Sequence, residues 1–260
     1  VRVANAFVKR NENGEITALH LSPSNEMNPF NTAVRERESF SIIRKLAVKE
    51  SIKLDTLFKA SNDIDKDVVA AINSGVYDMA IVGVGRSIYE GTVLGRMVGI
   101  GRRIIDPERL IDTLTGKEGL FERTDLEDRV RQILRESRIP VGIYVERTLD
   151  KLERITVPFF NLGDSFLLTY AQKLVHNQGA RVALLDVGDV FGQSPEMLAT
   201  VRALLEASPG KLELRRTSDS DNTFAEGQDL MLISIESWKR AVEKQSPWLS
   251  TAPSTLIMRP

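Results

Sequence analysis

The amino-acid sequence predicts an α/β fold of two tandem, doubly wound units with parallel sheets, and three observations support this prediction. Short apolar runs alternate with longer amphipathic stretches, which is typical of a parallel sheet covered by helices on both faces. The 260 residues exceed the usual size of one domain, which favours two. Segments of the second half also match segments of the first: Val182–Val187 matches Ile16–Leu21, Gln228–Ile233 matches Tyr77–Val82, and Pro253–Met258 matches Pro140–Val145.

The first unit is predicted over residues 1–150, with a helical insertion at about 87–124 before its last strand. The continuous apolar run Met79–Val84 is typical of a central parallel strand that is buried on both faces. The predicted elements are a helix in residues 1–10, strand Ile16–Leu21, a helix within Phe30–Ile52, strand Leu54–Lys59, helix Asp63–Ser74, strand Met79–Val84, a long helical stretch Thr92–Arg138 and strand Pro140–Val145.

The second unit is predicted over residues 151–260, after a polar junction at Arg147–Lys151. It opens with a strand, Ile155–Phe160, ahead of a helix near Ser165–Val175, whereas the first unit opens directly on its helix. One central strand is therefore missing from the first unit, and we expect the natural protein to continue upstream of Val1. We also expect either a strand from another segment or a distorted first sheet with an open slot. The junction is short, so the halves should pack together through apolar sheet edges or helices.

Composition excludes several classes of function. Lys plus Arg (35) nearly balances Asp plus Glu (36), so no excess of positive charge favours a nucleic-acid partner. The absence of cysteine fits a reducing, cytoplasmic location and excludes disulfides, cysteine nucleophiles and thiolate zinc sites. Apolar runs are far shorter than the ~18 residues that a membrane span needs, so this chain itself is not expected to cross a bilayer.

A glycine-rich turn after the most apolar strand is the candidate binding site. Gly83, Gly85 and Arg86 stand where backbone amides of a strand-to-helix turn can hold phosphate, and Gly95 follows in the predicted helix. We assign these four residues as candidate nucleotide-binding residues. The alternative is a structural turn, because a Gly-x-Gly motif alone is common.

Other polar motifs favour structural roles. The segment Asn161–Ser165 follows a strand at a place where ligands bind in open α/β sheets, but we favour Asp164 or Ser165 as N-cap of a helix beginning at Phe166, because Asp and Ser are strongly preferred as caps. His176 is expected to complement a helix C-terminus and His20 to cap a sheet edge, with no metal site. Since no Ser/His/Asp or Cys/His arrangement emerges, we predict no catalytic residues, no enzyme and no ATP hydrolysis.

The end of the first unit resembles a universal stress protein domain, through Tyr77–Ser87, the pair Leu94–Gly95 and Arg138–Val145. The resemblance implies the doubly wound fold shared with adenine nucleotide alpha hydrolases. It also implies ATP or another adenine nucleotide as cofactor, held in that family by Gly-x-x-Gly, nine residues, then Gly-Ser or Gly-Thr. Here Gly83 and Gly85 are one residue apart, Arg96 follows Gly95, and Ser234–Ser237 in the second unit contains no glycine, so any nucleotide is expected in the first unit alone.

A second resemblance concerns Ile155–Ser165, leading into Tyr170–Ala171. It is similar to the opening of the second stress-protein-like unit in the cytosolic tails of Kef and plant CHX-type monovalent cation/proton antiporters. The resemblance implies a regulatory domain at the cytosolic face of the inner membrane, within a longer membrane protein. Its partners are then the membrane transporter domain of the same chain and a small-molecule effector, and a homodimer is expected. The alternative is a free-standing tandem universal stress protein that binds an adenine nucleotide.

Overall fold

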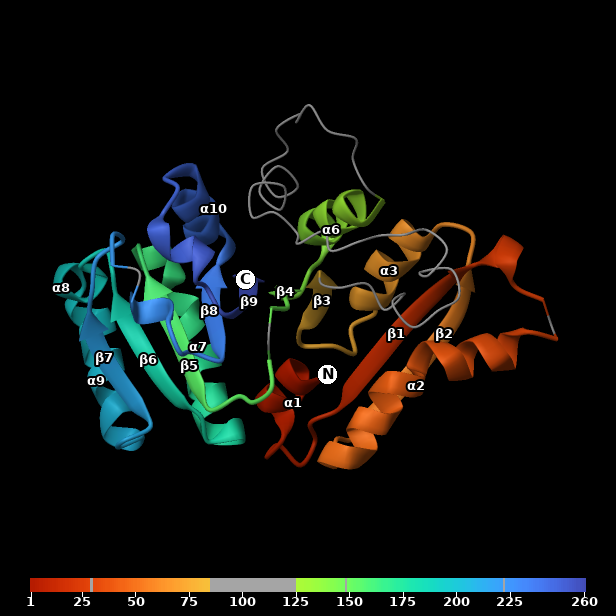
Figure 1. Cartoon of the computed structure of the whole chain (residues 1–260), viewed down its shortest axis with the longest axis horizontal. Helices are drawn as coiled ribbons and strands as arrows, with labels where there is room; N and C mark the ends of the chain where they lie inside the picture. Colours follow the sequence, from red (N-terminus) through yellow and green to blue (C-terminus); the bar gives the residue numbers. More distant parts are fainter. Residues whose placement is uncertain (29, 85–124, 148, 222) are drawn as a thin grey trace.

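Strands and helices alternate along the chain in an α/β fold (Figure 1). The computed structural model describes residues 1–28, 30–84, 125–147, 149–221 and 223–260. Within them a seven-stranded sheet has the order β3-β4-β9-β8-β5-β6-β7, and a separate two-stranded sheet pairs β1 with β2. Every described strand pair is parallel except β4 with β9. The predicted α/β class with a mostly parallel sheet is therefore confirmed.

The elements of the first half follow the order predicted from the sequence. Asp63 caps the third helix, because its side chain accepts a hydrogen bond from the Lys66 amide, and Gly75 ends that segment at a φ of 86°. The predicted helical stretch is described only from Asp125 onwards, and the insertion at 87–124 lies outside the described residues. The bounds are α1 (Arg2–Val8), β1 (Ile16–Pro23), α2 (Thr32–Glu50), β2 (Leu54–Ser61), α3 (Ile64–Ile72), β3 (Ala80–Val84), α6 (Asp125–Glu136) and β4 (Val141–Val145).

The second half is doubly wound about β5. The chain leaves β5 for β6 and β7 on one side and then returns to β8 and β9 on the other. A 3₁₀ turn, Leu162–Phe166, follows β5, and a π-helical turn, Leu174–Gln178, ends α7. The bounds are β5 (Arg154–Phe159), α7 (Leu167–Lys173), β6 (Arg181–Asp186), α8 (Val190–Gln193), α9 (Pro195–Ala207), β7 (Leu212–Arg216), β8 (Leu230–Ser234), α10 (Ile235–Glu243) and β9 (Ser254–Arg259).

The two halves share one sheet through the antiparallel pair β4 and β9, in which Ile143 lies opposite Ile257. Side chains reinforce the joint: the Arg147 guanidinium donates to the carbonyls of Leu249 and Ser250 at 3.0 and 2.9 Å. Helix α1 belongs to the core of the second half, since Val3, Ala6 and Phe7 are buried in the same cluster as the residues of β5. The expected packing of the halves through a sheet edge is thus confirmed.

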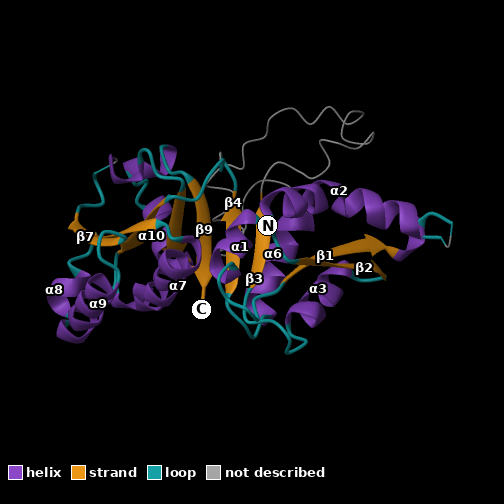
Figure 2. Cartoon of the chain, turned by 90° about the horizontal axis from the view of Figure 1, so that it is seen from below, coloured by secondary structure: helices purple, strands orange, loops and turns teal. Residues whose placement is uncertain are grey.

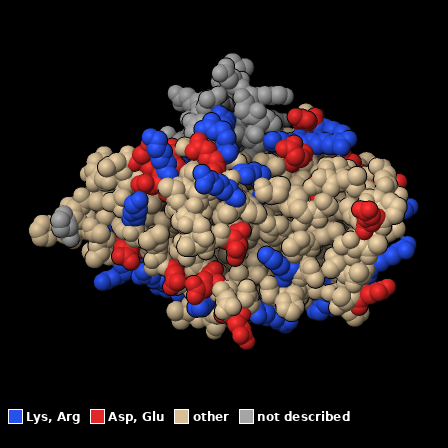
Figure 3. Space-filling view, turned by 180° about the vertical axis from the view of Figure 1, so that it is seen from behind, with Lys and Arg blue, Asp and Glu red and all other residues tan. Residues whose placement is uncertain are grey.

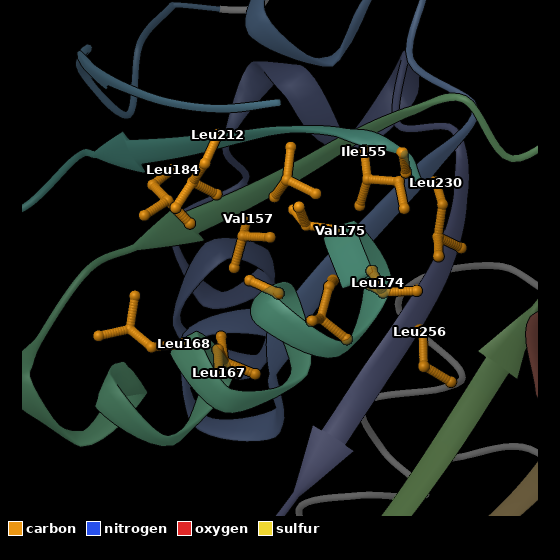
Figure 4. Close-up of a cluster of buried hydrophobic side chains, with 14 of the residues drawn as sticks. Ile155, Val157, Leu167, Leu168, Leu174, Val175, Leu184, Leu212, Leu230 and Leu256 are labelled. Carbon is orange, nitrogen blue, oxygen red and sulfur yellow. The ribbon is translucent and has the colours of Figure 1, made fainter. Parts of the chain in front are cut away.

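The strands of the second half are buried on both faces. Figure 4 shows Ile155, Val157, Leu184 and Leu230 packed over α7 on one face. Alternate residues of the same strands turn to the other face, where Met231, Ile233 and Ile257 meet the indoles of Trp238 and Trp248. This continuous burial explains the unbroken apolar runs in the sequence.

The strands of the first half are buried much less, and the expected burial of Met79–Val84 on both faces is wrong. Ala80, Ile81 and Val82 are half-buried and Gly83 is exposed, while every residue of β1 except Ser22 is half-buried. The reason is that β3 has only β4 beside it and β1 has only β2 among the described strands. Figure 2 shows the β1–β2 ribbon running across the direction of β4 and β9 rather than continuing their sheet.

Candidate functional site

The doubly wound second half places its candidate site where the chain leaves β5 and β8. In such sheets ligands bind beyond the carboxyl ends of the two strands at which the winding reverses. Asn161–Ser165 follows β5, and Ser234 ends β8 and begins α10. These two segments, about seventy residues apart in sequence, meet in one polar cluster.

The carboxylate of Asp164 is the centre of this cluster and is only 1% exposed. Its Oδ2 accepts hydrogen bonds from the backbone amides of Phe160 and Asn161, at 2.8 and 3.2 Å. The Ser234 hydroxyl donates to Oδ1, and the Ser237 hydroxyl lies 2.8 Å from both carboxylate oxygens. Four donors thus replace the water that a buried carboxylate loses.

The serines are held in turn by their own neighbours. The Ser234 side chain caps α10 by accepting from the Ser237 amide at 3.1 Å. Asn161 Nδ2 donates to the Ser237 hydroxyl at 3.2 Å, and Ser237 is 0% exposed. The first turn of α10, which is where an α/β sheet holds a phosphate, therefore faces the protein's own carboxylate.

This arrangement ties the two segments together. Ser237 is fully buried, and the Asp164 carboxylate is the acceptor of both serine hydroxyls. Over the ranges that the structure describes, no group of three His, Cys, Asp or Glu side chains could hold a metal ion. At the end of β8, where a nucleotide-binding domain would hold phosphate, the described residues leave no open site for an anion.

The capping interpretation of Asn161–Ser165 needs a correction. The N-cap is Asn161, whose Oδ1 accepts from the Gly163 amide at 2.8 Å, while Asp164 is the third residue of the turn and completes a capping box. Asp164 or Ser165 as the cap of a helix beginning at Phe166 is therefore wrong. The helical segment begins at Leu162, as a 3₁₀ turn that leads into α7.

Of the four candidate nucleotide-binding residues, only Gly83 lies within the described residues. It is exposed near the carboxyl end of β3, and no described atom lies within 4 Å of the position that a Cβ would take there. Gly85, Arg86 and Gly95 lie outside the described residues. The exposed end of β3 contrasts with the closed cluster at the end of β8.

The two histidines lie in different surroundings. The His20 ring stacks on Phe58, with centroids 5.4 Å apart and planes 3° from parallel, and meets Phe40 edge-on. Burial lowers the pKa of His20 below its ordinary value. His20 thus belongs to an aromatic cluster between β1, β2 and α2. His176 lies in the π-helical turn that ends at Gly179, and its carbonyl accepts a hydrogen bond from Arg10 at 3.0 Å.

A shallow basic groove of about 310 Å³ lies at the amino ends of β5, β6 and β7. Arg154, Arg181, Lys211 and Arg215 line it, and Glu213 pairs with Arg215 at 2.6 Å. Sequence reasoning missed this groove because its cations come from three separate strands. On the face of the molecule seen in Figure 3, by contrast, the basic and acidic side chains that are described lie intermixed.

Comparisons with known proteins support the fold. No family model and no curated protein matches the chain. A universal stress protein from Archaeoglobus fulgidus is similar in structure, with a TM-score of 0.50 and 13% identity over 98% of this chain and 90% of that chain. The cytoplasmic domain of a prokaryotic cation chloride cotransporter aligns with a TM-score of 0.49 and 11% identity, over 94% of this chain and 84% of that chain. The first likeness shows a universal stress protein-like fold.

Within the described part of the chain, every helix is too short or too polar to cross a bilayer.

Proposed function

We propose that this chain is a regulatory domain of a monovalent cation/proton antiporter, which senses a small-molecule effector or a partner and acts on the membrane transporter domain of the same chain. The observation that carries the proposal is the Asp164 cluster. It is built on Ile155–Ser165, the segment that resembles antiporter tails, and it closes the position at which a nucleotide-binding relative would hold phosphate. A closed, fully hydrogen-bonded cluster supports a structural and regulatory unit rather than an enzyme.

The proposal includes a tandem organisation with units at 1–150 and 151–260. In the second unit the order is β7-β6-β5-β8-β9, and in the first the pairs β2-β1 and β3-β4 repeat its two ends. On this assignment β1, β2, β3 and β4 are the counterparts of β6, β7, β8 and β9. The first unit has no described counterpart of β5.

Regulation by such a domain requires that its ligand bind more tightly to one state of the transporter than to the other. The basic groove at Arg154, Arg181 and Lys211 offers a place for an anionic effector, since its cations converge on one depression. An effector there would act across the sheet that joins the two halves.

The proposal is tested in everted membrane vesicles that contain an antiporter of the Kef or CHX type from the source organism, with and without the chain supplied as a fusion or in excess. Cation-dependent dissipation of a pH gradient is followed by dye fluorescence. We expect the chain to shift the half-maximal cation concentration severalfold. Unchanged exchange with potassium and with sodium, for each such antiporter, would contradict the proposal.

Sedimentation of the purified chain tests the expected homodimer.

The alternative function, a free-standing universal stress protein that binds an adenine nucleotide, is favoured by one observation. The end of β3 is open around Gly83 among the described residues, unlike the end of β8. Calorimetry with ATP and AMP tests it: one site per chain that Gly83→Val weakens at least about tenfold would support this alternative. The matched control is Ala203→Val, at an exposed position of α9 in the second half.

A further inference from the structure

We propose that the edge of β3 that no described strand covers takes up an extended, apolar β-strand of a partner polypeptide, in the place that β5 has beside β8. This interaction surface is additional to the regulatory role proposed above. It uses main-chain hydrogen bonds for affinity and the alternating side chains of the incoming strand for specificity, as in strand addition to an exposed sheet edge.

The residue types of β3 are those of an inner strand. Ala80–Val84 contains no charged or strongly polar side chain. Outer strands usually carry charges that prevent edge-to-edge pairing, and β2 and β7 do so here: β2 has Asp55 and Lys59, and β7 has Glu213, Arg215 and Arg216. Strand β1, which would lie on the other side of an incoming strand, has no Asp, Glu, Lys or Arg. An uncharged edge at β3 is therefore suited to a partner strand.

Burial leads to the same conclusion through a comparison within the molecule. All five residues of β8 are buried, as are five of the six residues of β6, because β5 lies between these strands. Their counterparts are less buried: Ala80–Val82 of β3 and every residue of β1 except Ser22 are half-buried, and Gly83 is exposed. Apolar strands at equivalent positions therefore bury less surface in the first unit than in the second. A strand placed between β3 and β1 would remove this difference in burial.

Described residues already cover both faces of β3, so among them only its edge remains open. On one face Val69 and Ile72 of α3 pack with Ala80 and Val82. On the other face Met79 and Ile81 pack against the cluster that contains α1. Helix α3 also contacts β1 and therefore spans the interval between the two sheets.

The occupant must run parallel to β3 and carry apolar side chains on both faces, as β5 does. In the second unit Thr156 of β5 lies opposite Met231 of β8. The match between Tyr77–Val82 and Gln228–Ile233 makes Ala80 the counterpart of Met231. The incoming strand therefore places its residue equivalent to Thr156 opposite Ala80. Pairing with β1 on its other side requires the β1–β2 ribbon to turn into line with the large sheet.

The first experiment adds a synthetic peptide with the sequence of residues 152–161, LERITVPFFN, to the intact chain and follows amide hydrogen exchange. The Ala80 amide donates to the Pro140 carbonyl, so the Ile81 and Gly83 amides face the open edge. We expect exchange of these two amides, and of amides in β1, to slow at least about tenfold at saturating peptide. A peptide of the same composition in scrambled order is the control. Slow exchange of these amides in the chain alone would overturn the proposal, as would protection limited to β2 or β7. Protection that grows with protein concentration and needs no peptide would identify a second copy as the occupant and also overturn it.

The second experiment fixes the register. Because the chain contains no cysteine, a single Ala80→Cys substitution provides a unique thiol. A peptide with cysteine in place of its threonine should form a disulfide with it, since neighbouring strands bring opposed residues within bonding range. The matched control is Leu57→Cys on β2, an edge residue that is 42% exposed. We expect trapping at Ala80→Cys to be at least about tenfold faster, and equal rates would refute the proposed place.

Discussion

A buried carboxylate is stable only where donors replace its water, and Asp164 shows how four donors do this. Asp164→Ala leaves two backbone amides and two hydroxyls without their acceptor. We expect this substitution to lower the free energy of unfolding by about 2–4 kcal/mol, measured by urea denaturation. The control is Glu236→Ala on the outer side of α10, where the side chain is 74% exposed and the change should stay within about 0.5 kcal/mol. Equal losses in the two variants would contradict the role given to the cluster.

His20 makes the stability of the first half depend on pH. Burial among Phe40 and Phe58 lowers the pKa of His20 in the folded protein, so the unfolded chain binds this proton more readily. The neutral His20 ring makes its full contribution to the free energy of unfolding above the unfolded-state pKa of about 6.5. This contribution is lost as the pH falls through the lower pKa of the folded state. We expect the thermal midpoint to fall as the pH drops below about 6.5, and His20→Phe to reduce this fall. An identical fall in both proteins would refute the assignment.

For individual residues, the sequence revealed the residue types but not the partners that they contact. Asp164 could be recognised as a capping residue, because Asp and Asn are preferred in such turns. Its contacts to Ser234 and Ser237 could not be recognised, since they depend on the position of β8 beside β5. The basic groove was missed for the same reason.

Glycines at two strand ends provide a test at the scale of the elements. Gly188 follows β6, and a Cβ there would lie 2.2 Å from the Phe160 carbonyl oxygen, which is backbone and cannot move freely. We expect Gly188→Ala to destabilise the protein by about 1–3 kcal/mol, as measured by thermal or urea unfolding. Gly83→Ala is the matched variant, because no described atom is near its Cβ position, and its effect should stay below about 1 kcal/mol. The reverse order of the two effects would show that the strand ends are packed differently.

Elements with strong patterns were predictable and edge elements were not. Continuous apolar runs correctly located β6, β8 and β9, because burial on both faces leaves a clear signal. Strand β7, with the sequence LELRR, was missed because an edge strand with charges resembles a surface segment. For β3 the strand was predicted correctly and its burial was not, since burial depends on a neighbour.

The whole molecule should open unevenly. The seven-stranded sheet crosses both halves through β4 and β9, whereas the β1–β2 ribbon is separate and half-buried. We therefore expect amides of β1 to exchange at least about tenfold faster than those of β5, β6 and β8 in native-state hydrogen exchange. The comparison uses amides with matched intrinsic rates. Uniform protection over all these strands would show that the ribbon is as stable as the large sheet.

Topology at this scale followed from the sequence only in part. The alternation of strands and helices predicted the α/β class, and the short junction at Arg147–Lys151 predicted that the halves pack together. The antiparallel pairing of β4 with β9 could not be predicted, because both strands are apolar runs that would also fit a parallel neighbour. Which edges meet is decided by packing over the entire molecule.

The reversal between β4 and β9 also determines which way the halves are directed. Strands on either side of this seam run in opposite senses, so Gly83 lies at one rim of the sheet and Asp164 with Ser234 at the opposite rim. A ligand at the first rim and a binding partner at the second are separated by the length of the strands and do not compete for space. An influence of one on the other can pass through the seam, as a change in twist between two halves that share seven strands, or through helix α1, which packs in the core of the second half.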